Sequence, residues 1–503
     1  PDRWPTINSK IHRFTESEVA IVIASEHEPW YSARKKDIKD FYWKHYRAHL
    51  EKSWDSSSVG LLDASIDDVV SRLSDPTRKD IYAVKGLVMG YVQSGKTAHF
   101  SGLIAKAADA GYRLIIVLSG TLEILRQQTQ RRVDKEIIGC ELLGPEEYGA
   151  DADWDKFVSH GGRPRDLGYF DWVRLTNKTD DYISLKKYLS IFEFPQINRA
   201  TPFNDPHSLR NASAKLAIIK KVPSRINKLT QDLKRLTNEQ RSILEHVPTL
   251  IIDDESDQAS VNTVNQAKPG KEGLRTSTNK AISKLLGVLP RAQYVGYTAT
   301  PFANFFINPD DAEDLFPKDF IVSLRRPDGY MGVSDFYDFD NQFEKGDFRG
   351  NYNAFVRPVE DSSDDPENLP KAIDSFILAG AIKLYRQNKD SKRFNYNHHT
   401  MLVHHASQRT VHEEDRQIVE KIFANGTRYS RPAGLEKLRN LFINDFTPVS
   451  LIRAPDAPFP RSFEELVPFV TQCIKKMHAG MPVRIVNGDN KYKDETPEFE
   501  QNS

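Results

Sequence analysis

The segment from Gly90 to Thr97, with the sequence GYVQSGKT, constrains the fold of this 503-residue chain more than any other feature. It fits the pattern G-x-x-x-x-G-K-[ST] and stands between an apolar run that predicts a strand, Gly86–Met89, and a predicted helix, Ala98–Ala110. Glycines let such a loop wrap closely around a phosphate, and the helix N-terminus attracts its negative charge. An ordinary glycine-rich turn is the alternative, but the flanking strand and helix favour a phosphate-binding loop.

The positions of this loop have expected roles around ATP and its magnesium ion. Lys96 is expected to reach the β- and γ-phosphates, and the Thr97 hydroxyl is expected to ligate Mg²⁺. The residues predicted to bind the nucleotide are Gly90, Gln93, Ser94, Gly95, Lys96 and Thr97.

Carboxylates follow a second apolar run, in the sequence TLIIDDESD at residues 249–257. Ligands of open α/β sheets bind at the carboxyl ends of the strands, so these side chains are predicted to meet the phosphate-binding loop. We assign Asp254 to the magnesium shell, together with Thr97, and Glu255 to orienting or deprotonating the attacking water. Lys96, Asp254 and Glu255 are thus the predicted catalytic residues, whereas Asp253 has no assigned role. A solvated acidic loop is the alternative.

Two threonines stand at the end of a third apolar run, in the sequence GYTATP at residues 296–301. Hydroxyl groups at this position can hydrogen-bond the acidic motif and report whether the γ-phosphate is present. We therefore predict that Asp257, Thr298 and Thr300 couple nucleotide state to conformation. The motif is weak by itself, and its order after the two stronger motifs supports it.

A further strand-to-helix turn, within residues 118–132, carries hydroxyl, amide and guanidinium groups that suit a nucleic-acid backbone. The predicted nucleic-acid contacts are Thr121, Arg126, Gln128 and Thr129. The alternative is a capped helix that exposes polar residues to solvent.

Alternating strand and helix patterns predict an α/β fold with a parallel sheet covered on both faces. Residues 1–80 are expected to form a helical N-terminal extension, residues 81–325 a first lobe with a helical insertion around 180–246, residues 326–370 an irregular linker, and residues 371–503 a short second lobe. The predicted strands of the first lobe are Gly86–Met89, Leu114–Leu118, Trp172–Leu175, Leu216–Ile219, Leu250–Ile252 and Tyr294–Tyr297. Those of the second lobe are Met401–His404 and Val483–Val486.

The amino-acid composition indicates where the protein works better than it indicates what the protein does. Lysine plus arginine equals aspartate plus glutamate at 70 each, so overall charge neither supports nor excludes a nucleic-acid partner. The two cysteines are too few for a disulfide framework, and no run approaches the ~18 apolar residues of a membrane span, so we expect a soluble cytoplasmic protein. The start at Pro1 and the polar run at 487–503 are consistent with a fragment.

Taken together, these motifs resemble the Z-one domain family, bacterial helicase-like ATPases of superfamily two that are often labelled endonucleases. The resemblance rests on GLVMGYVQSGKT, AADAGYRLIIVLSGTLEILRQQTQRR, TLIIDDESDQASVNT, YVGYTATPFANFFINP and LFPKDFIVSL, which lie within Gly86–Leu324. It implies two RecA-like lobes with ATP between them and single-stranded or duplex nucleic acid across their top. It also implies a bacterial defence cluster that contains a nuclease, a methyltransferase or a second ATPase.

The chain departs from that family in two respects. Ser256 stands where the family usually has alanine, and the late G-R-W and S-R-G strings that carry the family's arginine finger are missing. The expected second RecA-like lobe is therefore incomplete. The first hypothesis is an ATP-dependent motor or switch that acts on DNA in anti-phage or restriction-like defence. The alternative is an ATP-binding module that assembles with a partner nuclease or ATPase without efficient turnover.

Three other patterns receive simpler explanations. A nuclease site would need an E-x-K or D-x-K triplet after Asp310 or Asp328, and neither is followed by one on a convincing strand, so we expect no direct nuclease activity. A predicted strand would split a histidine-rich cluster between its two faces, which favours a structural role over a metal site. That cluster is His398, His399, His404, His405, His412, Glu413, Glu414 and Asp415. A basic run is expected to be a solvated helix face and comprises Lys220, Lys221, Arg225, Lys228, Lys234 and Arg235.

Overall fold

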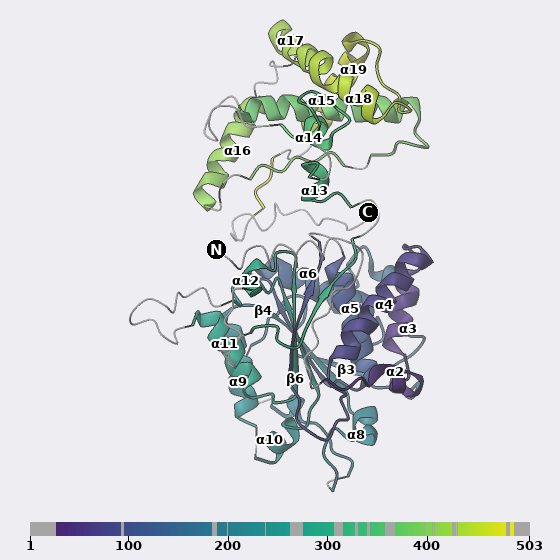
Figure 1. Ribbon diagram of the computed structural model, residues 1–503, viewed down its shortest axis with the longest axis vertical. Helices are drawn as coiled ribbons and strands as arrows, with labels where there is room; N and C mark the ends of the chain where they lie inside the picture. The colour runs from purple at the N-terminus through teal and green to yellow at the C-terminus, as the bar shows by residue number, and fades with distance from the viewer. Residues whose placement is uncertain are drawn as a thin grey trace. The chain divides into compact units, whose positions relative to one another are not determined.

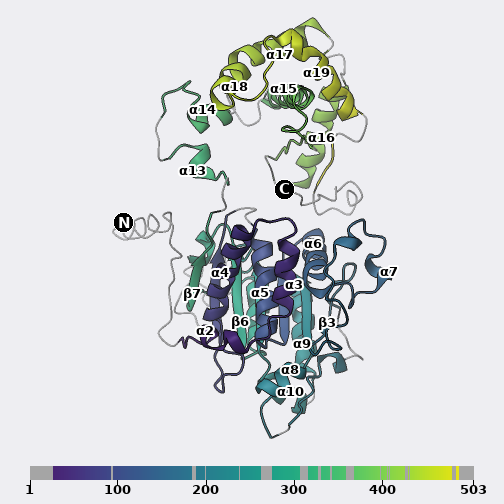
Figure 2. The same cartoon turned by 90° about the vertical axis from the view of Figure 1, so that its right-hand side faces the viewer.

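The structure, a computed structural model, divides the chain into two compact units, Pro1–Tyr330 and Met331–Ser503 (Figures 1 and 2). It describes residues 27–91, 95–183, 189–198, 200–236, 238–261, 275–305, 315–326, 330–339, 343–357, 368–396, 398–404, 406, 408–424, 429, 431–478 and 483–486. Each unit has its own hydrophobic core, and each is treated separately below.

The first unit is built on a seven-stranded parallel sheet with the order β3-β4-β2-β5-β6-β1-β7. Its strands are β1 Val84–Met89, β2 Leu114–Ser119, β3 Trp172–Arg174, β4 Ala214–Lys220, β5 Thr249–Asp254, β6 Ala292–Thr298 and β7 Phe320–Ser323. Strands of a parallel sheet are buried on both faces and read as continuous apolar runs, as the fully buried β2 does. The predicted α/β class with a parallel sheet is confirmed, and six of the strands lie where the sequence placed them.

One face of the sheet is covered by α5 (Lys96–Ala110), which is itself covered by α3 (Tyr42–Leu50) and α4 (Ser56–Arg72) (Figure 2). The helices approach closely, because a Cβ on Gly102 of α5 would lie 2.4 Å from Ile66 Cδ1 of α4. The buried ammonium of Lys106 on α5 forms ion pairs with Asp63 and Asp67 of α4. The helical extension predicted for residues 1–80 is, in its described part, an integral layer of the first unit.

The opposite face is covered by α9 (Pro223–Lys234), α10 (Asn238–Leu244) and α11 (Ser277–Leu286), which share a second hydrophobic core with β2, β4, β5 and β6 (Figure 1). The region around 180–246, predicted as a helical insertion, therefore also supplies the sheet strand β4. The remaining α-helices of this unit are α2 Tyr31–Arg34, α6 Glu123–Val133, α7 Pro145–Tyr148, α8 Pro206–Asn211 and α12 Phe302–Phe305. Short 3₁₀ and π turns are η1 Lys35–Asp37, η2 Asp134–Ile138, η3 Trp154–Lys156 and η4 Leu189–Phe192.

All the regular elements described in the second unit are helices. Its elements are α13 Val333–Phe336, α14 Asn351–Phe355, α15 Asn368–Lys389, α16 Arg409–Ala424, α17 Pro432–Leu441, η5 Phe442–Phe446, α18 Thr447–Arg453 and α19 Phe463–His478. Its core joins α15, α17 and α19 through residues such as Ile377, Leu438 and Leu466.

The two strands predicted for this unit, Met401–His404 and Val483–Val486, are not strands in the structure. Met401 and Val483 instead pack against the helical core, and Leu402 is 86% exposed. Short apolar runs form strands only where a neighbouring strand satisfies their backbone, and the described residues of this unit provide none. Across both units, none of the helices within the described ranges is long and apolar enough to cross a membrane.

Candidate nucleotide-binding site

The three strands that carry the predicted nucleotide motifs are neighbours in the sheet. β6 pairs with β1 on one side, with Met89 opposite Thr298, and with β5 on the other, with Asp254 opposite Tyr297. Because all three strands are parallel, the segments that follow them meet at one carboxyl edge. The sheet order therefore brings together the phosphate-binding loop, the acidic motif and the TATP motif.

The described ends of the predicted phosphate-binding loop have the geometry that such a loop requires. The Gly90 N–H donates to the Thr298 carbonyl at 3.0 Å, which ties the start of the loop to β6. Gly95 has φ +86°, a left-handed conformation that glycine adopts without steric cost. The residue before α5 is Gly95, which has no side chain that could cap the helix, and the first N–H groups of a helix attract anions. The predicted contacts of Gln93 and Ser94 fall outside the described residues.

Lys96, the first residue of α5, lies at the same edge of the sheet as the acidic motif. Its ammonium group donates to the Tyr91 carbonyl across the loop at 2.8 Å. Burial lowers the pKa of Lys96, and the negative charges of Asp254, Glu255 and Asp257 oppose this shift. The charges of the acidic motif therefore act on Lys96, and the half-buried Thr97 follows Lys96 in the first turn of the helix.

Asp254 and Glu255 have the chemistry of a magnesium-binding edge. Burial, together with the adjacent charge of Glu255, raises the pKa of Asp254 to about 6, although Lys221 opposes the rise. Oxygen ligands of this kind, with a threonine hydroxyl nearby, suit Mg²⁺, whose charge would favour the ionised carboxylates. Glu255 has φ +52°, which is rare for a residue with a side chain, and its N–H donates to Asp254 Oδ1 at 3.1 Å. The turn after β5 therefore holds a strained backbone at the position predicted to activate water.

The predicted coupling residues form one hydrogen-bonded group. Thr298 Oγ1 donates to Asp257 Oδ1 at 2.7 Å, and Thr300 Oγ1 donates to Asp257 Oδ2 at 2.6 Å. The Thr300 N–H in turn donates to Thr298 Oγ1 at 2.9 Å. Each carboxylate oxygen of Asp257 thus has its own hydroxyl donor, and the end of β6 is linked directly to the acidic turn.

Asp253, which had no role at the level of sequence, is directed away from the nucleotide motifs. Strand alternation places successive side chains on opposite faces, so Asp253 and Asp254 diverge. Asp253 is fully buried, and its carboxylate accepts hydrogen bonds from Lys221 Nζ at 3.0 Å and from the Tyr294 hydroxyl. Asp253 therefore stabilises the fold through these two contacts.

The sequence pattern does not mark Lys221 as a site residue. The prediction that Lys221 lies on a solvated basic helix face is wrong. Its side chain is completely buried beneath the acidic turn. The available signal was its position directly after the apolar strand β4, at the sheet edge to which β5 delivers several carboxylates. A buried lysine needs such partners.

Of the four predicted nucleic-acid contacts, only Thr121 and Gln128 are exposed. The Arg126 guanidinium is fully buried and donates at 2.9 Å to two carbonyls, those of Asn177 and Lys178. The hydroxyl of Thr129 is also turned inward, donating to the carbonyl of residue 125 at 2.9 Å. The predicted nucleic-acid contacts of Arg126 and Thr129 are therefore corrected, because both side chains are buried and form hydrogen bonds within the first unit.

The histidine cluster of the second unit is engaged in local packing. The His399 ring stacks on Phe376 with ring centroids 4.0 Å apart, and its Nε2 lies 2.7 Å from the Phe376 carbonyl. His412 Nε2 lies 2.9 Å from the Ala406 carbonyl, while His405 lies outside the described residues. Within the part of the chain that the structure describes, no group of three or more histidine, cysteine, aspartate or glutamate side chains is placed to hold a metal ion.

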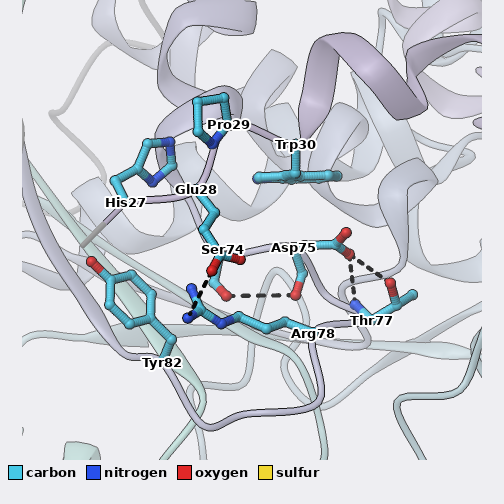
Figure 3. A pocket seen from close by; sticks show the side chains of 9 residues that line it. All are labelled: His27, Glu28, Pro29, Trp30, Ser74, Asp75, Thr77, Arg78 and Tyr82. Atoms are coloured by element: carbon cyan, nitrogen blue, oxygen red, sulfur yellow. Dashed lines mark hydrogen bonds and ion pairs between the residues drawn. The ribbon is translucent and has the colours of Figure 1, made fainter. Parts of the chain in front are cut away.

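A pocket of about 200 Å³ lies away from the nucleotide motifs, at the amino edge of the sheet where Tyr82 precedes β1 (Figure 3). In this pocket Arg78 lies 3.5 Å from Glu28, and its guanidinium lies 4.7 Å from the centre of the Tyr82 ring. The lining is completed by His27, Pro29, Trp30, Ser74, Asp75 and Thr77. Ligands of parallel sheets bind at the opposite edge, so this pocket is separate from the candidate site.

Comparisons with known proteins place a family match on the second unit. The family model for the Z1 domain matches residues 368–503, C-terminal to the motifs on which the resemblance was based. Among solved structures, the helicase domain of Hef from Pyrococcus furiosus is 13% identical, with 79% of this chain and 63% of that chain covered and a TM-score of 0.25. No curated protein is detectably similar in sequence. Residues 368–503 therefore match the Z1 domain, in agreement with the family resemblance predicted from the sequence.

Proposed function

We propose that this chain is an ATPase of the helicase-like class that works as a motor or switch on DNA. The observation that carries the proposal is the sheet order β5-β6-β1, which brings the helix start at Lys96 and the acidic segment Asp254–Asp257 to one carboxyl edge of the sheet. A lysine at the start of a helix and carboxylates at the end of a nearby strand are the groups that P-loop ATPases use to hold and cleave a phosphate chain.

The proposed roles follow from the position of each group. Lys96 and the N-terminus of α5 bind the phosphates, while Thr97 and Asp254 hold Mg²⁺. The ion, when bound, supplies positive charge that neutralises the phosphate oxygens. Glu255 orients the attacking water and accepts its proton, a task for which a carboxylate at the edge of a buried site is suited.

We propose that Asp257 couples the state of the bound nucleotide to a conformational change. Its carboxylate joins the acidic turn after β5 to Thr298 and Thr300 at the end of β6. A change in the acidic turn on loss of the γ-phosphate would therefore alter hydrogen bonds on the neighbouring strand, which is the kind of two-state element that a nucleotide switch needs. Thr121 and Gln128, exposed after β2, are the remaining candidates for contact with DNA.

The proposal is tested by steady-state phosphate release from the full chain with Mg²⁺-ATP, with and without single-stranded DNA. We expect turnover that DNA stimulates. In Glu255→Gln, turnover should fall at least ~100-fold while a fluorescent ATP analogue still binds, because loss of a catalytic acid or base costs about 10²–10⁴ in rate. Glu245→Gln, which changes an exposed carboxylate at the amino edge of the sheet, is the matched control and should keep full activity.

Two outcomes would overturn parts of the proposal. Turnover in Glu255→Gln equal to that of the wild type would remove Glu255 from the reaction. ATP binding by the wild-type chain without phosphate release under either condition would favour the second hypothesis, an ATP-dependent module that assembles with a partner nuclease or ATPase.

A further inference from the structure

Lys221 occupies an unusual place for a lysine, at the buried carboxyl edge of the sheet directly after β4. Its side chain has 0% exposure. Its backbone N–H donates to the Ser119 carbonyl at 3.0 Å, which fixes the residue to the end of β2. The side chain then extends beyond β2 towards β5, since β2 lies between β4 and β5 in the sheet.

A long side chain is required for this span. Adjacent strands are about 4.8 Å apart, so about 10 Å separate the end of β4 from the turn after β5, a span that only a long, extended side chain covers together with its hydrogen bonds. Lysine combines that reach with three N–H donors on a compact ammonium group. An arginine would have the reach but would bring a larger planar group into a fully buried space.

All three donors of Lys221 have acceptors in the acidic turn. Nζ lies 3.0 Å from Asp253 Oδ1, 2.7 Å from the Asp254 carbonyl and 2.6 Å from the Glu255 carbonyl. Two of the three contacts are therefore made to the main chain of the residues proposed to bind Mg²⁺ and activate water. A lysine that served only as the ion-pair partner of Asp253 would not need these two main-chain contacts.

The backbone that Lys221 contacts is the strained part of the turn. Glu255 has φ +52°, and such a conformation persists only where its surroundings hold it. The Ser256 N–H donates to the Tyr297 carbonyl at 2.9 Å, which fixes the exit of the turn to β6. Lys221 holds the carbonyl of the same Glu255–Ser256 peptide and the carbonyl of the peptide before it.

We propose that Lys221 is a positioning residue that clamps the main chain of Asp254 and Glu255 and so aims both carboxylates at the magnesium ion and the attacking water. This inference rests on the proposed ATPase function. Asp253 and Tyr294 act in the clamp by fixing the lysine from below, since both oxygens of the Asp253 carboxylate are used, one by Lys221 and one by Tyr294.

The test uses a double variant of the full chain, Lys221→Met/Asp253→Asn. Removal of the lysine alone would leave Asp253 as an unpaired buried charge, which is strongly destabilising, whereas the double variant removes both charges and the clamp together. We expect KM for Mg²⁺-ATP to stay within about threefold while kcat falls on the order of 100-fold, the effect of misplacing a reacting group by about 1 Å. The single variant Lys221→Arg, which keeps the positive charge, should have a kcat between those of the double variant and the wild type.

A second readout does not depend on turnover. Amide hydrogen exchange of the segment 254–258 should become faster in the double variant, because the turn loses its carbonyl contacts. The matched control is Lys215→Met, which removes another buried lysine of β4 whose ammonium lies 4.4 Å from the centre of the Phe194 ring, at the other end of the strand. Its exchange in 254–258 and its kcat should equal those of the wild type.

The outcomes separate this inference from the proposed function. A double variant that keeps wild-type kcat and wild-type exchange would show that Lys221 serves only as the partner of Asp253, and the inference would be wrong. If the wild type binds ATP without turnover, the proposed ATPase function fails, while exchange still decides whether Lys221 clamps the turn. Equal acceleration of exchange in Lys215→Met would also refute the clamp, because the effect would then be a general loss of stability.

Discussion

Replacement of Thr298 by valine is the sharpest perturbation of the coupling group, because valine keeps the shape of threonine and removes only its hydroxyl. Thr298 is 1% exposed. Its hydroxyl donates to Asp257 Oδ1 at 2.7 Å and accepts from the Thr300 N–H at 2.9 Å. The variant therefore loses two hydrogen bonds and leaves a buried apolar methyl group beside a carboxylate.

The cost of Thr298→Val can be estimated from these contacts. A hydrogen bond to a charged group contributes about 1.5–3 kcal/mol and a neutral one about 0.5–1.5 kcal/mol, so the two together contribute about 2–4.5 kcal/mol. Asp257 is partly exposed and Thr300 is exposed, so water can replace some of what is lost. We expect Thr298→Val to lower the free energy of unfolding of the first unit by about 2–3 kcal/mol.

The assay is urea unfolding followed by tryptophan fluorescence. The described part of the first unit contains Trp30, Trp43, Trp54, Trp154 and Trp172, and the second unit has no tryptophan in its sequence, so the signal follows the first unit even in the full chain. Thr298→Ser retains the hydroxyl and is the matched control, expected within about 1 kcal/mol of the wild type. A Thr298→Val midpoint equal to that of the wild type, with an unchanged dependence on urea, would refute the assigned hydrogen bonds.

Three further predictions test other contacts of the first unit. Gly296→Ala should lower the free energy of unfolding by about 1–3 kcal/mol, because the new Cβ would lie 2.8 Å from Ser256 Oγ, and Ser256→Gly should recover part of this loss in the same urea assay. Burial lowers the pKa of His99 to about 4. The unfolded chain therefore binds the extra proton below pH 6.5, so stability should fall by about 2 kcal/mol from pH 8 to pH 5, and His99→Gln should show a smaller fall. An equal fall in both proteins would contradict the assignment. Arg126→Met should lower the stability of the first unit without a specific effect on DNA affinity. Gln128→Ala should weaken binding of a labelled single strand without a change in stability. The reverse pattern would show that Arg126 contacts DNA.

The sequence predicts the sheet of the first unit well because its physical signals are local. Parallel strands buried on both faces are mainly apolar, so Leu114–Leu118 in β2 and Leu250–Ile252 in β5 stand out as apolar runs. Motifs at their ends are then expected at one edge, and the order β5-β6-β1 brings them together. The Asp257 contacts with Thr298 and Thr300 follow from that order.

The remaining features depend on contacts between distant segments, which residue patterns do not encode. Arg126 has the sequence signature of an exposed helical arginine, and only the loop at Asn177 and Lys178 buries it. Lys221 reaches its acceptors because β2 alone separates β4 from β5. The apolar run Met401–His404 reads as a strand by itself but packs on helices, since a strand needs a neighbour that this part of the second unit does not supply.

The most direct test of the central claim, a Mg²⁺-ATP site around Lys96, is an equilibrium titration of a fluorescent ATP analogue against the full chain. We predict saturable binding by the wild type that Lys96→Ala weakens at least ~10-fold, which corresponds to about 1.4 kcal/mol. Lys79→Ala, an exposed lysine at the opposite edge of the sheet, is the matched control and should bind as the wild type does. Equal affinities of the wild type and Lys96→Ala would contradict the assignment of this site.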